Sequence, residues 1–187
     1  DQLARAASAK GLGLVSWTVC LHNTWLATSY PHCAERGAYG DLPGWSLCPS
    51  SDDVRSYIIS LCTDLARNYG VSRIELESCH FGGYGHVHHH LKEGVDLGSV
   101  GRYLFGLCFS EGCRARAGAL GLDPYGLRSW VAGRLDRVLA GGSPLDGDVA
   151  EFLSEHVELD AYQRMREDVV TDLVREVRRA TGVEVSY

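Results

Sequence analysis

The chain of 187 residues contains no long hydrophobic run and no cluster of basic residues. Every apolar run is far shorter than the roughly 18 residues that a transmembrane helix needs, so we expect no membrane span. The formal net charge of −6 gives no electrostatic footprint for nucleic acid or for an anionic membrane. We therefore expect no nucleic-acid or membrane partner. The first residues have no initiator methionine and no signal-peptide pattern. Because we interpret the seven cysteines mainly as reduced thiols, we expect a cytoplasmic protein.

The sequence also lacks the spaced motifs that usually mark metal and phosphate sites. It has no paired Cys-x-x-Cys, no His-Glu-x-x-His and no Gly-x-Gly-x-x-Gly. Its seven cysteines are an odd number without the spacing of a small disulfide framework. Cys33, Cys48, Cys108 and Cys113 could supply four zinc ligands, but we favour reduced, buried structural thiols. The sequence therefore predicts neither a bound metal nor another cofactor.

Two segments that are present have the pattern of parallel strands. Residues 14–23 and 71–78 each follow a helix that ends at a glycine, and in each segment apolar residues alternate with polar ones. A strand points successive side chains to opposite faces, so the apolar stripe with Trp17 is expected to face helices. The other stripe suits the interior of a barrel and consists of Ser16, Thr18, Cys20 and His22. The fold class predicted is α/β, a partial (β/α)8 TIM-type barrel with a helical insertion.

The remaining elements fit one globular domain, with 45% hydrophobic and 22% charged residues. Residues 50–53 can cap a helix that ends at Gly70, and Asp123-Pro124 can start another. Residues 98–181 are mostly helical and include the insertion, and residues 183–187 form a last strand. A complete barrel has eight strands in about 250 residues. We therefore interpret 1–187 as a segment of one barrel domain, with the remainder in a longer chain.

Glu77 is the candidate catalytic residue. Glu75 and Glu77 lie two apart on the second strand, so both would point into the barrel, and Glu77 lies nearer its C-terminal mouth. Two carboxylates forced inside raise each other's pKa or pair with a cation. The alternative for Glu75 is a structural salt bridge to Arg73 or to another arginine.

Several residues near the two strand ends are candidates for substrate binding. His22 and Asn23 would face the same mouth as Glu77, or would simply cap the strand end. Trp25 and Trp45 lie in the irregular stretch 24–49, where aromatic rings suit either sugar faces or a loop core. The complete set of substrate-binding candidates is His22, Asn23, Trp25, Trp45, Glu75, His80, Tyr84 and His86.

A histidine-rich loop offers a different chemistry. His86, His88, His89 and His90 follow Glu77 closely, and together with His22 or Glu77 they could hold a divalent metal. The alternative function is therefore a metal-dependent hydrolase or isomerase that uses His22, Glu77 and the 86–90 loop.

Three stretches carry a resemblance to a known family: Leu-Cys-Pro-Ser at 47–50, Ile-Glu-Leu-Glu at 74–77 and Gly-Leu-Cys-Phe-Ser-Glu-Gly-Cys-Arg at 106–114. Over residues 12–122 the chain resembles uncharacterised bacterial glycoside-hydrolase-like barrels. In that family a Cys-Phe-Cys-x-x-Cys segment is typical, and Ser110 stands at its middle cysteine.

The resemblance implies a carbohydrate substrate and hydrolysis of a glycosidic bond. Such hydrolysis uses two carboxylates, of which Glu77 would be one. The second would lie beyond this chain or is a residue of the chain that the pattern does not single out. The alternatives are the metal-dependent enzyme and a non-catalytic barrel that binds carbohydrate through its loop aromatics.

Overall fold

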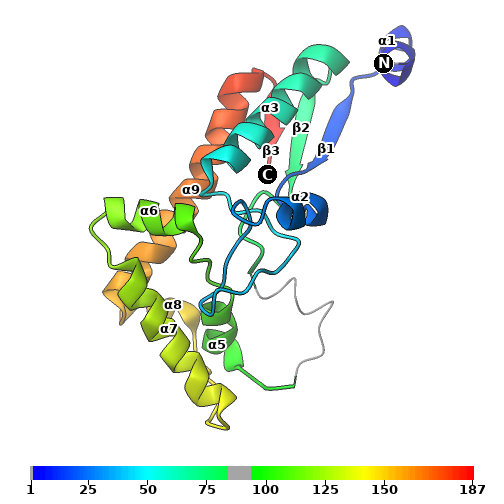
Figure 1. The fold of residues 1–187 in the computed structure, drawn as a ribbon. Helices are drawn as coiled ribbons and strands as arrows, with labels where there is room; N and C mark the ends of the chain where they lie inside the picture. The colour runs from blue at the N-terminus through cyan, green and yellow to red at the C-terminus, as the bar shows by residue number, and fades with distance from the viewer. Residues whose placement is uncertain (1, 84–93) are drawn as a thin grey trace.

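A computed structural model describes residues 2–83 and 94–187 (Figure 1). Its strands are β1 (Val15–Val19), β2 (Arg73–Glu77) and β3 (Glu184–Ser186), which form one parallel sheet in the order β1-β2-β3. The described helices are α1 (Gln2–Ala9), α2 (Thr24–Ser29), α3 (Asp52–Tyr69), α5 (Gly98–Phe105), α6 (Glu111–Ala119), α7 (Pro124–Leu139), α8 (Val149–Ser154) and α9 (Val157–Thr181). None of these helices combines the length and the apolar character of a membrane span.

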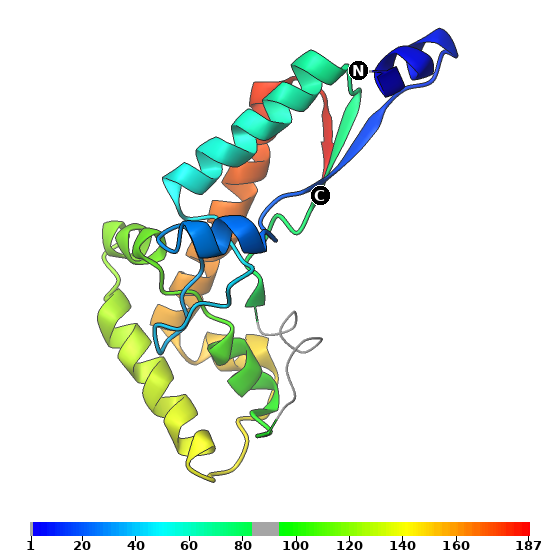
Figure 2. The same cartoon turned by 45° about the vertical axis from the view of Figure 1, so that its right-hand side comes forward.

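Helices α3 and α9 lie on the same face of the sheet (Figure 2). The predicted helix after residues 50–53 is confirmed as α3: Ser51 is its N-cap, and two aspartates in its first turn complement the helix dipole. It ends at Gly70, whose φ of +63° is costly for residues with a Cβ. Ile74 and Leu76 of β2 are buried under the two helices.

A buried arginine joins these two helices. Arg55 of α3 donates from Nη1 to the carbonyl oxygen of Val169 in α9 at 2.9 Å, and its Nη2 lies 2.9 Å from Glu176 Oε1. The guanidinium group also donates to the carbonyl of Pro49 at 3.4 Å. Since a buried cation is costly without partners, these contacts fix α3 against α9 at one place.

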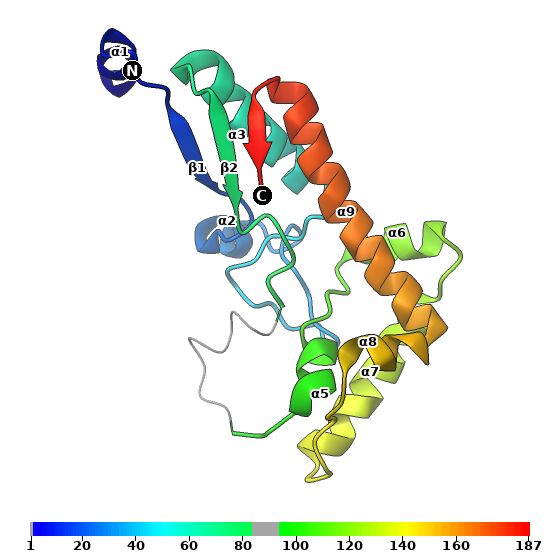
Figure 3. The same ribbon diagram turned by 180° about the vertical axis from the view of Figure 1, so that it is seen from behind.

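The long helix α9 passes through two separate hydrophobic cores (Figure 3). Its C-terminal half contributes Leu173 and Val177 to the sheet core, the cluster between the sheet and α3. Its N-terminal half contributes Leu159 and Tyr162 to the helical core, the cluster among α5, α6, α7 and α9. In the helical core the rings of Phe109 and Tyr162 stack with centroids 5.3 Å apart. Continuous helical backbone therefore connects the two cores.

The connection between α2 and α3 also touches both cores. Isolated bridges pair His22 with Ser46 and Ala34 with Leu47. Ala34 and Leu47 belong to the sheet core, whereas Ala38 and Cys48 belong to the helical core. The connection thus enters the helical core twice before α3 returns to the sheet core.

The prediction of a TIM-type barrel is wrong for the described residues. A (β/α)8 barrel closes eight strands on themselves, whereas this sheet has three strands and is open, with β1 and β3 at its edges. The long stretch between β2 and β3 supplies helices for a second core, and its described part adds no strand to the sheet. The chain is a mixed α/β protein with a small parallel sheet.

The orientation predicted for the first strand is also wrong. Trp17 is 71% exposed, whereas Thr18 and Cys20 are buried. The register explains the difference, because Trp17 pairs with Glu75 and therefore shares its face. A tryptophan turned toward α3 and α9 would have brought Glu75 into the sheet core. Instead the small polar residues of β1 face the two helices, and the hydroxyl groups of Ser16 and Thr18 form a hydrogen bond with 3.0 Å between their oxygens.

Candidate metal centre

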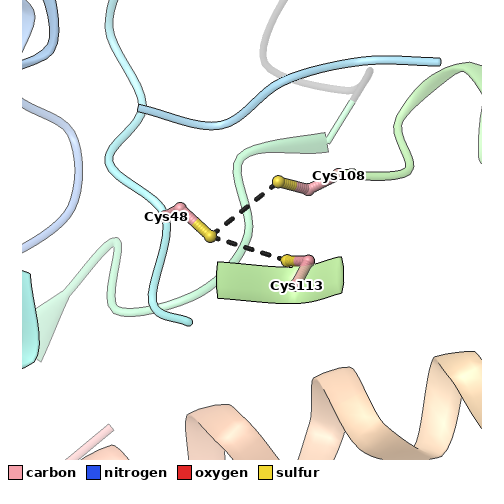
Figure 4. Close-up of side chains that lie close together, drawn as sticks. All are labelled: Cys48, Cys108 and Cys113. Atoms are coloured by element: carbon pink, nitrogen blue, oxygen red, sulfur yellow. Dashed lines mark hydrogen bonds between the residues drawn. The ribbon is translucent and has the colours of Figure 1, made fainter. Parts of the chain in front are cut away.

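Three cysteines from distant parts of the sequence meet in the helical core (Figure 4). Cys48 precedes α3, Cys108 lies between α5 and α6, and Cys113 lies in the first turn of α6. All three side chains are buried. We refer to Cys48, Cys108 and Cys113 as the three-cysteine cluster.

The sulfur atoms of the cluster lie at the spacing of metal ligands. Cys48 Sγ is 3.6 Å from Cys113 Sγ and 3.8 Å from Cys108 Sγ, and all three sulfurs lie within 4.8 Å of one another. A zinc ion about 2.3 Å from each of four tetrahedral ligands holds neighbouring sulfurs about 3.8 Å apart. The cluster therefore has the dimensions of three corners of a zinc–thiolate tetrahedron.

Polar groups around the cluster are suited to stabilising negative sulfur. The backbone N–H of Arg36 donates to Cys108 Sγ at 3.4 Å. Two hydroxyl groups adjoin the other sulfurs: Ser110 Oγ is 3.0 Å from Cys48 Sγ, and Ser50 Oγ is 3.3 Å from Cys113 Sγ. Hydrogen bonds of this kind orient metal ligands and tune the charge on them.

The proton affinities of the three thiols differ sharply. Burial raises the pKa of Cys48 well above its usual value and raises that of Cys108 to about 12. Burial also opposes ionisation of Cys113, but hydrogen bonds with the other two cysteines and with both serines bring its pKa below the usual value. Of the three thiols, Cys113 therefore loses its proton most readily. A divalent metal would displace the protons that the cluster still holds.

Cys33 does not belong to this cluster, although the sequence analysis grouped it with the other three as a possible zinc ligand. It is buried in the sheet core, beside the exposed His32 and Asp53. Residues 30–51 connect α2 to α3, and we call them the 30–51 connection. The spacing of the cysteines in the sequence does not show that only three of the four converge, because the convergence depends on where this connection crosses between the two cores.

Sequence reasoning also missed Glu35, a buried carboxylate near the cluster. The Ser46 hydroxyl and the Gly82 N–H both donate to Glu35 Oε1, at 2.5 and 2.6 Å. Burial raises its pKa to about 7, and the nearby Cys108 adds to this rise. With Trp45 and Cys108 it lines a cavity of about 50 Å³, room for a few waters but not for a sugar. No pattern in the irregular 24–49 stretch distinguishes this glutamate from an exposed one.

The predicted catalytic carboxylates lie on the opposite face of the sheet from α3 and α9. Glu77 ends β2, is partly exposed, and accepts a hydrogen bond from the Ser78 hydroxyl at 2.6 Å. Ser78 has a left-handed backbone with φ of 52°, which turns the chain out of the strand. Glu75 lies 3.4 Å from Arg73 Nη2, which is the salt bridge considered as its alternative role. Among residues 2–83 and 94–187 no strand closes the sheet into a barrel around these carboxylates, and a catalytic role for Glu77 stays a prediction.

Three of the predicted substrate-binding residues, His22, Asn23 and Trp45, lie together, because the Asn23 N–H donates to the Trp45 carbonyl oxygen at 2.8 Å. Asn23 is the N-cap of α2, where its Oδ1 accepts from the Leu26 N–H at 2.9 Å. His22 forms its bridge with Ser46, one residue from Trp45. Trp25 lies on α2 and is 68% exposed. His80 is exposed, and its Nδ1 lies 2.8 Å from the carbonyl oxygen of Phe81.

Two of these candidates, Tyr84 and His86, lie outside the described residues, as does the 86–90 histidine loop. The metal-dependent alternative built on that loop is therefore still a prediction. The interpretation as a hydrolase and glycosidase has no support, because it depended on a barrel that the open sheet replaces.

A comparison of the chain with protein-family models finds no match, and comparisons with curated proteins and with solved structures find none either. No related protein therefore tests the resemblance to glycoside-hydrolase-like barrels. The evidence for a metal site at the three-cysteine cluster is the geometry of its sulfur atoms.

Proposed function

We propose that this chain is a zinc-binding protein whose metal site is the three-cysteine cluster. One observation carries the proposal: three buried sulfurs from separate segments lie 3.6 and 3.8 Å apart around Cys48. Thiolate ligands in tetrahedral spacing favour zinc over magnesium or calcium, which prefer oxygen. A serine oxygen would complete the four ligands, since the hydroxyls of Ser50 and Ser110 border the cluster.

The site is suited to a structural role. Its ligands are buried in the helical core, and the Tyr162 hydroxyl donates to the Cys108 carbonyl oxygen at 2.6 Å, which ties the cluster to α9. Zinc would connect the end of the 30–51 connection, the segment before α6, and α6 itself. Structural zinc sites contribute folding free energy because the unfolded chain does not hold the ligands together.

The cysteine content supports a location in the cytoplasm. The seven cysteines are free and buried, and thiolate ligands require a compartment that keeps thiols reduced. A cytoplasmic location therefore belongs to the same proposal as the zinc site.

The test is metal analysis of the purified full chain, followed by cobalt substitution. We expect about one zinc per chain, and a Co²⁺-loaded protein that shows thiolate-to-metal charge transfer and tetrahedral visible bands. Cys48→Ser and Cys113→Ser should lose most of the bound zinc and shift these bands.

Cys62→Ala is the matched control, because Cys62 is as buried as Cys48 but lies in the sheet core. It should keep the zinc. A wild-type chain that binds no zinc after reduction, or a disulfide between Cys48 and Cys113 in freshly isolated protein, would contradict the proposal.

A further inference from the structure

A second group of metal-ligating side chains lies outside the three-cysteine cluster. His32 and Cys33 are neighbours in the 30–51 connection, and Asp53 lies in the first turn of α3. Each residue offers one ligand atom, and these three atoms all lie within 4.8 Å of one another. We refer to His32, Cys33 and Asp53 as the histidine–cysteine–aspartate group. Its cysteine belongs to the sheet core, so the group is separate from the three-cysteine cluster in the helical core.

Hydrogen bonds of the backbone hold the two segments of this group in place. The Cys33 N–H donates to the Tyr30 carbonyl oxygen at 2.9 Å, and the Cys33 carbonyl oxygen accepts from the Cys48 N–H at 2.8 Å. Asp53 follows Ser51, the N-cap of α3, whose N–H donates to the Cys48 carbonyl oxygen at 3.0 Å. The fold thus brings the ligand residues together without a metal, which lowers the entropic cost of binding one.

The spacing of the group fits ligands around one zinc ion. Nε2 of His32 lies 3.8 Å from Oδ2 of Asp53. A tetrahedral zinc ion about 2.0–2.2 Å from a nitrogen and an oxygen ligand holds these two atoms about 3.4 Å apart. The two side chains are 63 and 80% exposed, so small rotations can close the difference.

The thiol distinguishes this group from an ordinary surface ion pair. An exposed pair of His32 and Asp53 contributes little to stability and does not need a sulfur atom beside it. Cys33 nevertheless brings its sulfur to the same point, with the Ser51 hydroxyl oxygen 4.0 Å away. Imidazole and thiolate ligands together favour zinc over magnesium and calcium, which prefer oxygen ligands.

The group borders a groove with room for a further ligand. The three residues line a groove of about 350 Å³, whose other lining residues are apolar or aromatic: Leu26, Tyr30, Leu47, Val54 and Tyr57. Within the described part of the chain, the lining of this groove offers no fourth histidine, cysteine or carboxylate. A zinc ion with three protein ligands keeps a water molecule in its fourth position, as zinc ions at catalytic sites do.

We propose that the histidine–cysteine–aspartate group is a second zinc site, with three protein ligands and an exchangeable fourth position that opens into this groove. It should bind zinc more weakly than the three-cysteine cluster, because two of its ligands are exposed whereas those of the cluster are buried. A purified chain that retains about one zinc in the cluster should therefore take up another when zinc is added.

Zinc titration of the purified full chain under reducing conditions tests the proposal. His32→Gln and Asp53→Asn change exposed side chains, and each should weaken the binding of one added zinc at least tenfold because it removes a ligand. Competition with a chromogenic chelator measures the affinity. Zinc that binds elsewhere, for example at the histidines of residues 86–90, is unaffected by these variants.

Asp52→Asn and His80→Gln are the matched controls. Asp52 is the other aspartate in the first turn of α3 and is 93% exposed, but it pairs with Arg116 at 3.0 Å. His80 is an exposed histidine outside the group. Both variants should bind the added zinc like the wild type.

Cobalt tests the thiolate ligand and the open position. With zinc retained in the three-cysteine cluster, one added Co²⁺ should show thiolate-to-metal charge transfer, and Cys33→Ser should abolish it. Azide, which ligates open metal positions, should shift the visible bands of this Co²⁺.

A wild type that binds no added zinc would overturn the proposal, as would His32→Gln and Asp53→Asn variants that bind it as tightly as the wild type. Visible bands that azide leaves unchanged would contradict the exchangeable fourth position. Cys48→Ser should lose the tightly bound zinc but keep the added one, so failure of the cluster as a zinc site and failure of this second site are distinguishable.

Discussion

Ser110 uses its side-chain oxygen for two contacts at the three-cysteine cluster. As the N-cap of α6 it accepts from the Cys113 N–H at 3.3 Å, and it lies 3.0 Å from Cys48 Sγ. A hydroxyl at this position can support a thiolate, but it does not provide a fourth sulfur. The residue at 110 therefore determines how firmly the cluster can hold a soft metal.

Replacing Ser110 with cysteine should tighten zinc binding. We expect Ser110→Cys to raise the zinc affinity about tenfold or more, because four thiolates enclose the ion completely. The loss of the N-cap would cost about 1 kcal/mol of stability in the metal-free protein. Competition with a chromogenic chelator measures the affinity. Ser143→Cys, which adds a thiol in an exposed loop, should leave it unchanged.

The buried Glu35 should make stability depend on pH. Its folded pKa of about 7 lies above the usual 4.5, so the folded protein holds this proton more tightly than the unfolded chain does. The contribution of the protonated Glu35 to the free energy of unfolding is complete below about pH 4.5 and is lost as pH rises through 7. We expect the free energy of unfolding to fall by about 2 kcal/mol between about pH 5.5 and about pH 8 from this group.

Urea unfolding of wild type and Glu35→Gln at those two pH values checks this expectation. The glutamine keeps an oxygen for the Ser46 hydroxyl and the Gly82 N–H but does not titrate, so the variant should lose this part of the pH dependence. An identical pH dependence in the two proteins would show that Glu35 titrates normally.

At the scale of the helices, Arg55 makes the contacts that hold α3 against α9. We expect Arg55→Met to lower the free energy of unfolding by about 2 kcal/mol, because it removes the ion pair with Glu176 and the hydrogen bond to Val169. Arg175→Met removes an exposed pair with Asp172 on the same helix and should cost less than about 0.5 kcal/mol. Equal effects in chemical denaturation would contradict a special role for Arg55.

The sequence predicts the individual elements better than their arrangement. The helix that ends at Gly70 and the helix that starts at Asp123-Pro124 are both confirmed. Asp123 caps its helix through its side chain as predicted, whereas Ser51 is an N-cap without a side-chain hydrogen bond. The face that Trp17 occupies is different, because it depends on pairing with Glu75 across the strand register. Alternation shows that two faces differ, but it does not show which one the helices cover.

The three-cysteine cluster was harder to predict from the sequence than the individual helices were. Cys48, Cys108 and Cys113 have no zinc-motif spacing, and they meet only because the 30–51 connection crosses into the helical core. Glu35 has no motif either, since its character comes from burial and from its hydrogen bonds to Ser46 and Gly82. Alternation does single out Glu77, and this residue lies on the face of the sheet that points away from α3 and α9.

For the whole molecule, zinc should stabilise one core more than the other. Removing the metal with a chelator should lower the melting temperature by roughly 10 °C, which corresponds to about 4 kcal/mol for tight binding in a domain of this size. Hydrogen exchange should increase most in α5, α6 and α7, which surround the three-cysteine cluster, and least in β1, β2 and α3. Equal increases in both regions would show that the metal does not act on the helical core.

The continuous helix α9 has a consequence for how the protein forms during translation. Synthesis proceeds from the N-terminus, so β1, α3, β2 and α5–α8 are all synthesised before residues 157–181. Until α9 emerges, the sheet core lacks Leu173 and Val177, and the helical core lacks Leu159 and Tyr162. Both cores of the nascent chain therefore expose apolar surface until α9 packs into them. During that period a chaperone that binds exposed hydrophobic segments would protect the chain from aggregation.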